Sequence, residues 1–500
     1  MAQALMFVGT SSESGKSVMT AGFCRLLKHR GISVAPFKAQ NMALNSYVTR
    51  DGKEMGRAQA VQAEAAGVEP DVDMNPILLK PVSDFGSQVI VQGVVRGTMD
   101  AKTYYREKKQ FWKYVTESYD RLVCAYDCLL IEGAGSPVEI NLKDSDIVNM
   151  AMAEYADARV ILVADIDRGG VFASILGTVE LLEQHERERL IGFIINKFRG
   201  DPALLKDGLA FIEQKTHTPV LGIVPHLKDL YIPGEDSVAL SRKTSCPPAH
   251  NNSSVSIGII HVPHLSNYTD FDPLEADTRF QVDYLNTPRS LEHYDAIILP
   301  GSKNVFFDIK YLADRGFIQK LLEYDRGGGR IVGICGGYQM LGMRIEDPLG
   351  VEGRGGDVSG IGLLPIYTVM EQHKITSRFC GRFILPGIAF PLEAEGYEIH
   401  MGRSFPLSGS SVLLLRNNDT YAGCSDMGRP DGRVWGTYLH GLFENDVLRT
   451  YFLRWLASTD HVPIHDGFSY QAFKEQNYDM LAKLIETQVD TAYIFRHLNL

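Results

Sequence analysis

The stretch that most constrains the fold runs from Arg330 to Gly342 and reads R-I-V-G-I-C-G-G-Y-Q-M-L-G. Apolar residues lead into Cys335, two glycines follow, and the run from Tyr338 to Leu341 is compatible with a helix. The pattern predicts a buried strand, a tight turn that carries the thiol, and a helix. Glycines permit a strained turn and let a substrate carbonyl approach the sulfur, and a helix start favours a thiolate. The alternative is a buried structural cysteine on a glycine-rich turn.

The same alternation of strand and helix recurs along most of the chain. Short apolar runs separated by helical stretches occur at Ile32–Phe37, Asp127–Ile131, Arg159–Ala164, Leu190–Asn196, Val220–Val224, from Val255 onward and at Asp295–Leu299. This alternation predicts an α/β fold with doubly wound, mostly parallel sheets. Ligands of such folds bind at the carboxyl ends of the strands.

A change of composition divides the chain. Residues 241–254 read S-R-K-T-S-C-P-P-A-H-N-N-S-S, without apolar periodicity, which is typical of a linker. A chain of 500 residues is long enough for two or three domains. We therefore expect one α/β domain at 1–240 and a second at 255–445. Residues 446–500 read as helices, which we expect to pack on the second domain.

Composition argues against several classes of protein. The formal net charge of -11 disfavours a general nucleic-acid binder. No apolar run approaches the roughly 18 residues that cross a bilayer, and the seven cysteines include no paired C-x-x-C hooks for zinc. The start, M-A-Q-A-L-M-F-V-G, reads as a first strand rather than a signal peptide. We expect a cytoplasmic protein without nucleic-acid or membrane partners; the sequence leaves its oligomeric state open.

A nucleotide site is predicted by the loop G-T-S-S-E-S-G-K-S at 9–17, which joins an apolar strand to a helix. Backbone N–H groups of such a loop cradle phosphates, Lys16 reaches the outer phosphates, and Ser17 places its hydroxyl on Mg²⁺. The spacing departs from the usual loop because Thr10 stands where a glycine is common. A Ser/Gly linker is the alternative, but the strand–loop–helix context disfavours it. We expect Thr10, Gly15, Lys16 and Ser17 to bind ATP.

Polar side chains follow several predicted strands. Gln40, Asn41 and Asn45 come after the strand at Ile32–Phe37, where they are either ligands or turn-forming residues. Glu132 ends another strand beside glycines, where a carboxylate is a good second ligand for nucleotide-bound Mg²⁺. The next strands end in D-I-D-R-G-G, which holds Asp165 and Arg168, and in Asn196.

A base for Cys335 is predicted far along the chain, where V-W-G-T-Y-L-H-G places His440 at a strand end beside glycine. A thiol and a distant histidine, each at a strand end, are typical of a Cys–His nucleophile pair. We expect the backbone N–H groups of Gly301 and Gly336 to form an oxyanion hole. His400 has a similar glycine-flanked setting and is the closest rival to His440.

Taken together, the two halves resemble the cobyric acid synthases, the glutamine-dependent amidotransferases of cobalamin biosynthesis, over about residues 3–445. The specific signals are K-A-Q-N-M at 38–42, E-M-G-R-A-Q at 54–59, M-N-P-I-L-L-K-P at 74–81, E-G-A-G-S-P at 132–137 and D-I-D-R-G-G-V-F at 165–172. The first half is similar to dethiobiotin synthetase-like P-loop proteins. The second is similar to class I glutaminases. The resemblance therefore implies a P-loop NTPase-like domain followed by a class I glutamine amidotransferase-like domain.

The resemblance also implies the activity, a glutamine-hydrolysing carbon–nitrogen ligase. His440 would activate Cys335 and later protonate the departing ammonia. ATP with Mg²⁺ would activate the b, d, e and g carboxylates of adenosylcobyrinic acid a,c-diamide by phosphorylation, and ammonia would then displace phosphate. Lys16 and Ser17 would serve the phosphates, Ser17 and Glu132 the metal, and Asn196 the adenine. The residues expected to contact the corrinoid are Gln40, Asn41, Asn45, Asp165 and Arg168.

Alternatives and departures accompany this resemblance. The sister a,c-diamide synthase typically carries G-P-D-Y-I-D where this chain has Ala39-Gln40-Asn41-Met42, which favours the cobyric acid enzymes. That synthase, another glutamine-fed P-loop ligase, or a P-loop switch ATPase fused to an inactive glutaminase-like module are the alternatives. Leu442 stands where many class I glutaminases have an acid, so that Glu444 is the nearest acid, and Gly234 replaces another family acid. Either another residue orients His440, or Cys335 and His440 work as a dyad.

Overall fold

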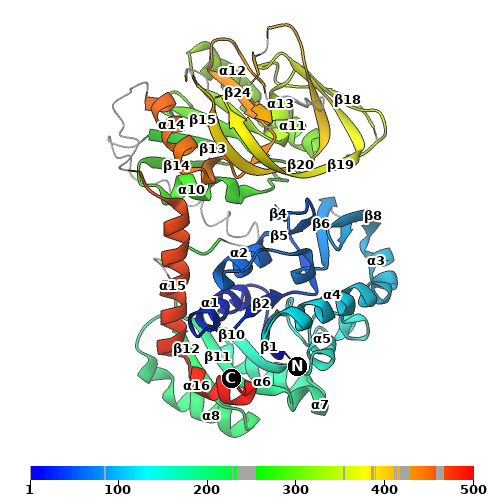
Figure 1. The fold of residues 1–500 in the computed structure, drawn as a ribbon, viewed down its shortest axis with the longest axis vertical. Coiled ribbons are helices and arrows are strands. Elements are labelled where there is room, and N and C mark those ends of the chain that lie inside the picture. Colours follow the sequence, from blue (N-terminus) through cyan, green and yellow to red (C-terminus); the bar gives the residue numbers. More distant parts are fainter. Residues whose placement is uncertain are drawn as a thin grey trace. The chain divides into compact units, whose positions relative to one another are not determined.

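The computed structural model describes residues 2–83, 86–227, 230–233, 255–352, 355–384, 388, 390–409, 411–412, 414–416, 427–457 and 467–500. The chain forms two compact units (Figure 1). Unit 1 comprises Met1–Ala43, Glu54–Glu235 and Lys474–Leu500, and unit 2 comprises Leu44–Lys53 and Asp236–Phe473. The predicted linker at 241–254 and Gly234 lie outside the described residues.

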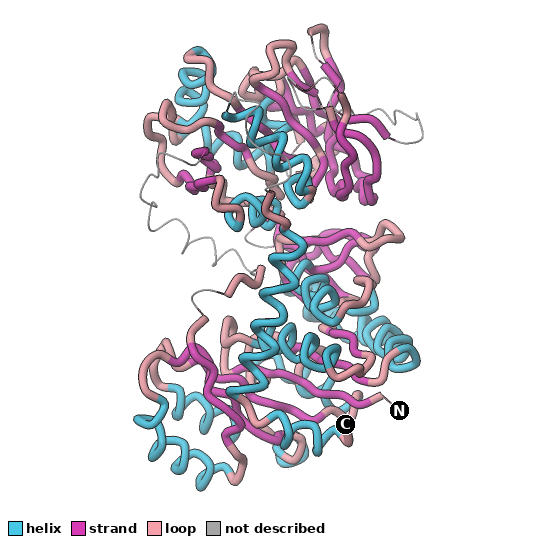
Figure 2. The backbone as a smooth tube through the Cα atoms, turned by 60° about the vertical axis from the view of Figure 1, so that its left-hand side comes forward, coloured by secondary structure: helices cyan, strands magenta, loops and turns pink. Residues whose placement is uncertain are grey.

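Unit 1 is built on a six-stranded sheet in which every pairing is parallel. In spatial order its strands are β12 (Val220–Pro225), β11 (Leu190–Phe198), β10 (Arg159–Asp165), β1 (Gln3–Gly9), β9 (Cys128–Glu132) and β2 (Val34–Phe37). These strands are almost continuously apolar because helices cover both faces of the sheet (Figure 2). The predicted doubly wound fold of this half is confirmed.

Most helices of unit 1 lie between these strands in the sequence. They are α1 (Lys16–His29), α2 (Arg57–Ala66), α3 (Ala101–Glu107), α4 (Trp112–Ala125), α5 (Met150–Tyr155), α6 (Val171–Leu181), α7 (Gln184–Arg187) and α8 (Lys206–Thr216). Helix α1 begins within the phosphate loop, at Lys16, and its buried residues include Met19, Phe23 and Leu27. The loop is therefore held between a buried strand and a buried helix.

A smaller four-stranded sheet in unit 1 was not predicted. Its order is β3 (Gln40–Met42), β6 (Ile77–Ser83), β7 (Gly86–Val91) and β8 (Val94–Asp100), with only the first pair parallel. The short β5 (Glu54–Gly56) precedes α2. The motif M-N-P-I-L-L-K-P supplies most of β6, so a stretch without clear periodicity becomes a central strand through its partners on both sides.

Unit 2 contains a seven-stranded sheet whose first five strands are parallel. In spatial order they are β14 (Phe280–Leu285), β13 (Val255–Ile260), β15 (Ala296–Leu299), β16 (Ile331–Ile334), β24 (Val434–Thr437), β23 (Met427–Gly428) and β21 (Ser411–Val412). Its helices include α10 (Asp272–Ala276), α11 (Val305–Asp314), α12 (Phe317–Arg326), α13 (Gly336–Leu341) and α14 (Asp446–Ala457). The predicted α/β class of this half is likewise confirmed.

A second, mostly antiparallel sheet completes unit 2. Its order is β18 (Gly356–Ser359), β17 (Arg344–Asp347), β19 (Ile366–Phe383), β20 (Leu392–Pro406) and β25 (Leu439–His440), and β22 (Leu414–Arg416) pairs with β19. Strand β25 pairs with β20 at Tyr397 and Glu398. The sheet thereby places His440 beside the long hairpin of β19 and β20, which the sequence pattern did not reveal.

The C-terminal helices correct one expectation. Helix α14 belongs to unit 2, whereas α15 (Tyr470–Gln488) from Lys474 onward and α16 (Thr491–Leu498) belong to unit 1. The apolar residues of this segment enter the core of unit 1, among them Tyr478, Leu481, Ala482, Ile485, Val489, Ile494, Phe495 and Leu498. Even α15, with 19 residues, is not apolar enough to cross a membrane, and no other helix in the described part of the chain is.

Small residues and charges explain why α15 packs there. A Cβ atom on Gly22 of α1 would lie 2.1 Å from Ile485 Cδ1, so the glycine permits close approach of the two helices. The buried Arg25 pairs with Glu475 at 2.7 Å and with Asp479 at 2.6 Å. The apolar face of an amphipathic helix does not by itself specify which hydrophobic core it packs on. The contacts of α15 with Gly22 and Arg25 specify the core of unit 1.

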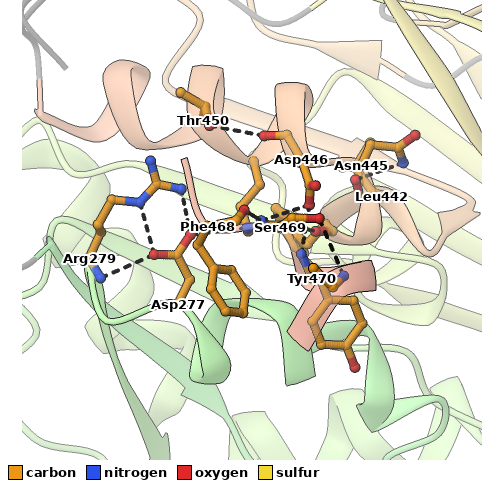
Figure 3. A network of polar contacts seen from close by, with 12 residues as sticks. Asp277, Arg279, Leu442, Asn445, Asp446, Thr450, Phe468, Ser469 and Tyr470 are labelled. Atoms are coloured by element: carbon orange, nitrogen blue, oxygen red, sulfur yellow. Dashed lines mark hydrogen bonds and ion pairs between the residues drawn. The ribbon is translucent and has the colours of Figure 1, made fainter. Parts of the chain in front are cut away.

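A polar network holds the start of α14 to the rest of unit 2 (Figure 3). Its centre is Arg449, which is fully buried and donates to Asp277 at 3.1 Å, to Asp446 at 2.9 Å and to the Phe468 carbonyl at 2.5 Å. Asp446 also accepts a hydrogen bond from the Tyr470 N–H at 3.0 Å. A buried guanidinium is tolerated because all of these acceptors surround it.

Candidate active sites

The phosphate loop of unit 1 has the backbone shape that its residues predict. Gly15, at the N-terminus of α1, has a φ of 107°, and a Cβ atom there would lie 1.9 Å from Asn196 Nδ2. At Gly9 a Cβ atom would lie 2.2 Å from Ser14 Oγ. Lys16 is buried, and its Nζ donates to the carbonyls of Ser11 and Gly135 at 3.0 and 3.1 Å. The loop therefore folds tightly around the Lys16 ammonium.

Glu132 lies fully buried at the end of β9 and carries three hydrogen bonds. Its Oε1 accepts from Ser17 Oγ at 2.7 Å and from Lys38 Nζ at 2.9 Å, and its Oε2 accepts from Gln62 Nε2 at 2.5 Å. Lys38 is itself buried, so this is a charge pair within a polar network rather than a surface salt bridge. Ser17 and Glu132, predicted separately, are brought together.

The donor set at Ser17 and Glu132 suits Mg²⁺. The ion prefers oxygen ligands and commonly takes one or two from the protein and the rest from phosphates and water. A hydroxyl and a carboxylate next to a phosphate loop provide that set. Among the described residues, no group of three or more His, Cys, Asp or Glu side chains forms a larger metal site.

Glu13 places a negative charge inside the phosphate loop, and two basic residues lie beside it. Its carboxylate pairs with Arg168, and its backbone carbonyl accepts a hydrogen bond from Lys197 Nζ at 2.6 Å. The same Lys197 Nζ binds Asp165 Oδ2 at 2.8 Å. We expected Asp165 and Arg168 to contact the corrinoid. In the structure Arg168 contacts Glu13 of the phosphate loop, and Asp165 contacts Lys197. Their contact with a substrate stays a prediction.

Asn196 also holds the loop. Its Nδ2 donates to the Ser14 carbonyl at 2.9 Å, and its side chain is buried. The predicted contact with adenine is not tested by this geometry. The structure adds that Asn196 supports the backbone next to Gly15.

The three amides predicted to bind substrate are divided between the units. In unit 1, Gln40 Oε1 accepts from the Tyr104 hydroxyl at 2.6 Å, and Asn41 Nδ2 donates to Gln59 Oε1 at 3.0 Å. Asn45 belongs to unit 2. A corrinoid role for these amides stays a prediction, and proximity in sequence does not make them one cluster.

The predicted elbow is present in unit 2. Cys335 connects β16 to α13 with a φ of 51° and a ψ of −109°, a conformation that is strained for a residue with a side chain. At Gly337 a Cβ atom would lie 2.0 Å from the Leu299 carbonyl oxygen, and at Gly333 it would lie 2.6 Å from Tyr338 Cα. Both glycines are therefore required for the turn to pack.

His440 lies against Cys335 and is oriented by an acid that the sequence analysis did not identify. His440 Nδ1 lies 2.6 Å from Asp270 Oδ2, and the Gly441 N–H donates to Asp270 Oδ1 at 3.0 Å. The Cys335 side chain lies close enough to His440 to help raise the pKa of the imidazole, and its Sγ lies 3.7 Å from the Ile399 carbonyl oxygen. Asp270 lies in the 3₁₀ turn Tyr268–Phe271, after β13, and is 5% exposed. The three side chains form the chain Cys335–His440–Asp270.

The electrostatics of this group favour a charged imidazole. Burial of the His440 ring opposes protonation, but the Asp270 carboxylate and the Cys335 side chain outweigh it and raise the pKa of His440 to about 10. Tyr397 stacks on the ring at a centroid distance of 5.2 Å. The arrangement suits a thiolate–imidazolium pair, which is the nucleophilic form of a Cys–His site.

Gly301 and Gly336, which we expect to form the oxyanion hole, lie near Cys335 and His440. A Cβ atom on Gly301 would lie 3.6 Å from His440 Cε1, and one on Gly336 would lie 2.7 Å from the Ser302 nitrogen. Both glycines therefore lie next to the Cys–His pair, and their oxyanion role stays a prediction. The rival His400 binds the Gly402 carbonyl through Nδ1 at 2.6 Å.

The sequence analysis did not identify two residues of these sites, Asp270 and Lys38. Asp270 is 170 positions from His440, and the acids near it in N-Y-T-D-F-D read as helix-start residues. Lys38 opens the motif K-A-Q-N-M directly after a strand, which was a usable signal for a buried charge at a ligand site.

Comparisons with known proteins match a domain family to each half of the chain. Residues 5–237 match the CobQ/CobB/MinD/ParA nucleotide binding domain, and residues 256–448 match the CobB/CobQ-like glutamine amidotransferase domain. A cobyric acid synthase from Syntrophobacter fumaroxidans is 48% identical over 100% of this chain and 99% of its own length. One from Carboxydothermus hydrogenoformans is 47% identical over 100% of both. The structure of PurLQS from Thermotoga maritima has a TM-score of 0.30 at 16% identity, over 45% of this chain and 98% of that one.

The relatives match both halves of the chain in their order, and the phosphate loop, the elbow cysteine and its histidine lie in the matched domains. The chain binds a nucleotide in its first half and carries a glutamine amidotransferase domain in its second. It belongs to the cobyric acid synthase family.

Proposed function

We propose that this protein makes adenosylcobyric acid by amidating the b, d, e and g carboxylates of adenosylcobyrinic acid a,c-diamide with ammonia from glutamine. It is a glutamine-hydrolysing carbon–nitrogen ligase. The observation that carries the proposal is the buried chain Cys335–His440–Asp270 in a protein that also has a complete phosphate loop. An inactive glutaminase-like module would have no need of an acid placed 2.6 Å from the histidine.

The glutaminase reaction follows from the geometry of unit 2. The Cys335 thiolate attacks the glutamine amide carbon, and the backbone N–H groups of Gly301 and Gly336 hold the oxyanion. His440 gives its Nε2 proton to the departing ammonia, which leaves a thioester on Cys335. His440 then removes a proton from water, and the hydroxide hydrolyses the thioester to glutamate and the free thiol. Asp270 keeps the proton on Nδ1 throughout.

The amidation reaction is assigned to unit 1. ATP bound with Mg²⁺ supplies the phosphoryl group that activates a carboxylate, and ammonia displaces phosphate with loss of a proton. Lys16 and the loop N–H groups would stabilise the charge of the transferred phosphoryl group. Ser17 and Glu132 would hold the metal. Lys38, within 2.9 Å of Glu132, would keep positive charge beside the same centre.

Mass spectrometry of the corrinoid tests the proposal. Protein incubated with adenosylcobyrinic acid a,c-diamide, ATP, Mg²⁺ and glutamine should give a ladder of one to four amide substitutions. Lys16→Ala should abolish the ladder with any nitrogen source. Cys335→Ser should abolish it with glutamine and keep it with ammonium chloride, because only the nitrogen supply is lost. An unchanged corrinoid in the presence of active glutaminase would point to a different carboxylate substrate.

A further inference from the structure

A short segment, Leu44–Lys53, interrupts unit 1 in sequence and belongs to unit 2. We call it the inserted segment; it contains β4 (Ser46–Val48). Val48 packs with Tyr397 and Ile399 in a small apolar cluster. The Tyr397 hydroxyl donates to the Ser46 carbonyl at 3.1 Å. Because Tyr397 also stacks on His440, the inserted segment contacts the immediate surroundings of the glutaminase histidine.

Two further hydrogen bonds connect the inserted segment to the turn that carries Asp270. The Ser46 N–H donates to Asn267 Oδ1 at 2.9 Å, and Asn45 Oδ1 accepts from the Tyr268 N–H at 3.1 Å. Asn45, Ser46 and Asn267 are each at most 2% exposed. Water does not compete for these bonds, so each has a defined geometry.

The bond from Ser46 decides which way the Asn267 amide points. A carboxamide presents an acceptor on one side and two donors on the other, and a backbone N–H can be satisfied only by the acceptor. With Oδ1 on Ser46, Nδ2 faces His440, 3.3 Å from Nε2 and 3.5 Å from Nδ1. Asn267 has a φ of 53°, a left-handed conformation that asparagine adopts more readily than most residues.

An amide donor beside the ring affects which form of the imidazole is favoured. Asp270 stabilises the imidazolium through Nδ1, whereas the positive end of the Asn267 amide, nearly equally far from both ring nitrogens, disfavours it. Among the described residues, the titratable groups that face the ring are Asp270, Cys335 and Tyr397, whose ring stacks on the imidazole. Glu398, on the strand paired with β25, accepts a hydrogen bond from Ser377 at 3.2 Å. Asn267 is thus placed to tune the proton that His440 exchanges with Cys335.

We propose that the inserted segment is a positioning element of the glutaminase site. Ser46 and Asn45 hold the turn at 267–268, so that the Asn267 amide stays beside His440 and Asp270 stays within hydrogen-bond distance of His440 Nδ1. The glutaminase then depends on residues that follow the motif K-A-Q-N-M of the other unit after Ala43 and Leu44. This inference rests on the proposed glutaminase function of Cys335 and His440. It gives Asn45 a role in nitrogen supply.

Matched substitutions in the full-length protein test the inference. Ser46→Pro removes the N–H that orients Asn267, whereas Ser46→Ala keeps it. We expect Ser46→Pro to lower the kcat of glutamine hydrolysis about 10-fold or more, as expected for loss of one to two hydrogen bonds near a catalytic group, and Ser46→Ala to leave kcat nearly unchanged. Asn45→Ala should lower kcat in the same way, with rescue by Asn45→Asp, which retains the acceptor.

Asn267→Asp supplies a readout that a merely structural role would not move. The aspartate still accepts from Ser46 but places a carboxylate oxygen near His440, which favours the imidazolium. The pH profile of kcat should therefore move to higher pH by about one unit, with little change in KM. Folding and the ATP site are checked by ammonium-dependent amidation, which every variant should retain.

The outcomes separate the two proposals. A wild-type protein without glutamine hydrolysis would overturn the assigned function. An active wild type, with Ser46→Pro and Asn267→Asp both matching its kcat and pH profile, would overturn only the positioning role of the inserted segment.

Discussion

At the residue scale, both sites rely on side chains that are buried and charged. Glu132 and His440 are each fully buried, and each has an oppositely charged or hydrogen-bonding partner within 3 Å. An isolated charge would be costly in that environment, so the partners are what allow the charge to persist. The chemistry of each site is therefore inseparable from its partners, Lys38 and Asp270.

Asp270→Asn should lower the kcat of glutamine hydrolysis by about 10²–10⁴-fold, since loss of the orienting acid in a triad has effects of that order. The amide can no longer stabilise the imidazolium or select the Nδ1 proton. Steady-state glutaminase assays measure the change. Glu444→Gln is the matched control, because Glu444 is the acid nearest to His440 in sequence and should leave the rate nearly unchanged. Equal rates for Asp270→Asn and wild type would favour a dyad.

Gly15→Ala should abolish nucleotide binding at micromolar concentrations, measured by isothermal titration calorimetry. The φ of 107° strains any side chain, and the new methyl group would collide with Asn196 Nδ2. Gly177→Ala is the control, because it lies in α6 with nothing within 4 Å of its Cβ position. That change should keep affinity and stabilise by about 0.5–1 kcal/mol. Unaltered affinity in Gly15→Ala would mean that the loop relaxes around the methyl group.

At the element scale, the short loops at the carboxyl ends of the strands of unit 2 carry the residues of the proposed glutaminase site. The turn after β13 supplies Asp270, the elbow after β16 supplies Cys335, and the strand following β24 supplies His440. Parallel strands end at the same edge of their sheet, so loops distant in sequence converge. The start of α11, after β15, is held in a different way, by the partly buried carboxylate of Glu352.

Glu352→Gln should remove a pH dependence of stability from unit 2. Burial raises the pKa of Glu352 to about 7, although Lys303 and the N–H groups of Val305 and Phe306 oppose the rise. The folded protein then binds a proton that the unfolded chain has released above about pH 4.5, so this stabilisation is complete at low pH and lost as pH rises through 7.

Urea unfolding at pH 5 and pH 8 measures this effect. Relative to Glu352→Gln, the wild type should lose about 1–3 kcal/mol between the two pH values. The glutamine still accepts from the Val305 N–H, so the start of α11 keeps its cap. A constant difference between the two proteins at both pH values would show that Glu352 does not titrate in this range.

At the scale of the whole molecule, the two compact units are not two consecutive stretches of chain. The inserted segment at 44–53 belongs to unit 2, and residues 474–500 return to unit 1. Each unit therefore completes its core or its site with a segment from elsewhere in the sequence. Deleting the C-terminal residues would remove part of the core of the nucleotide-binding unit, not an appendage of the glutaminase.

Leu481→Ala should destabilise unit 1 by about 2–5 kcal/mol, because Leu481 is fully buried in the core of that unit. Thermal loss of ATP binding should occur at a lower temperature, while thermal loss of glutaminase activity should be nearly unchanged. Met480→Ala, its half-exposed neighbour on α15, should change neither. A fall in glutaminase stability alone would place the helix in unit 2 after all.

The sequence by itself determined the α/β class and the order of the two domains, and it predicted the residues at the centres of the two sites, among them Lys16, Ser17, Cys335 and His440. These depend on local signals, since apolar periodicity and glycine spacing define a strand, its turn and the next helix. Only the tertiary structure decided that Asp270 meets His440, that Lys38 meets Glu132, and that residues 44–53 and 474–500 exchange units. Those contacts depend on sheet order and on complementary surfaces, such as Gly22 against Ile485, which join positions hundreds of residues apart.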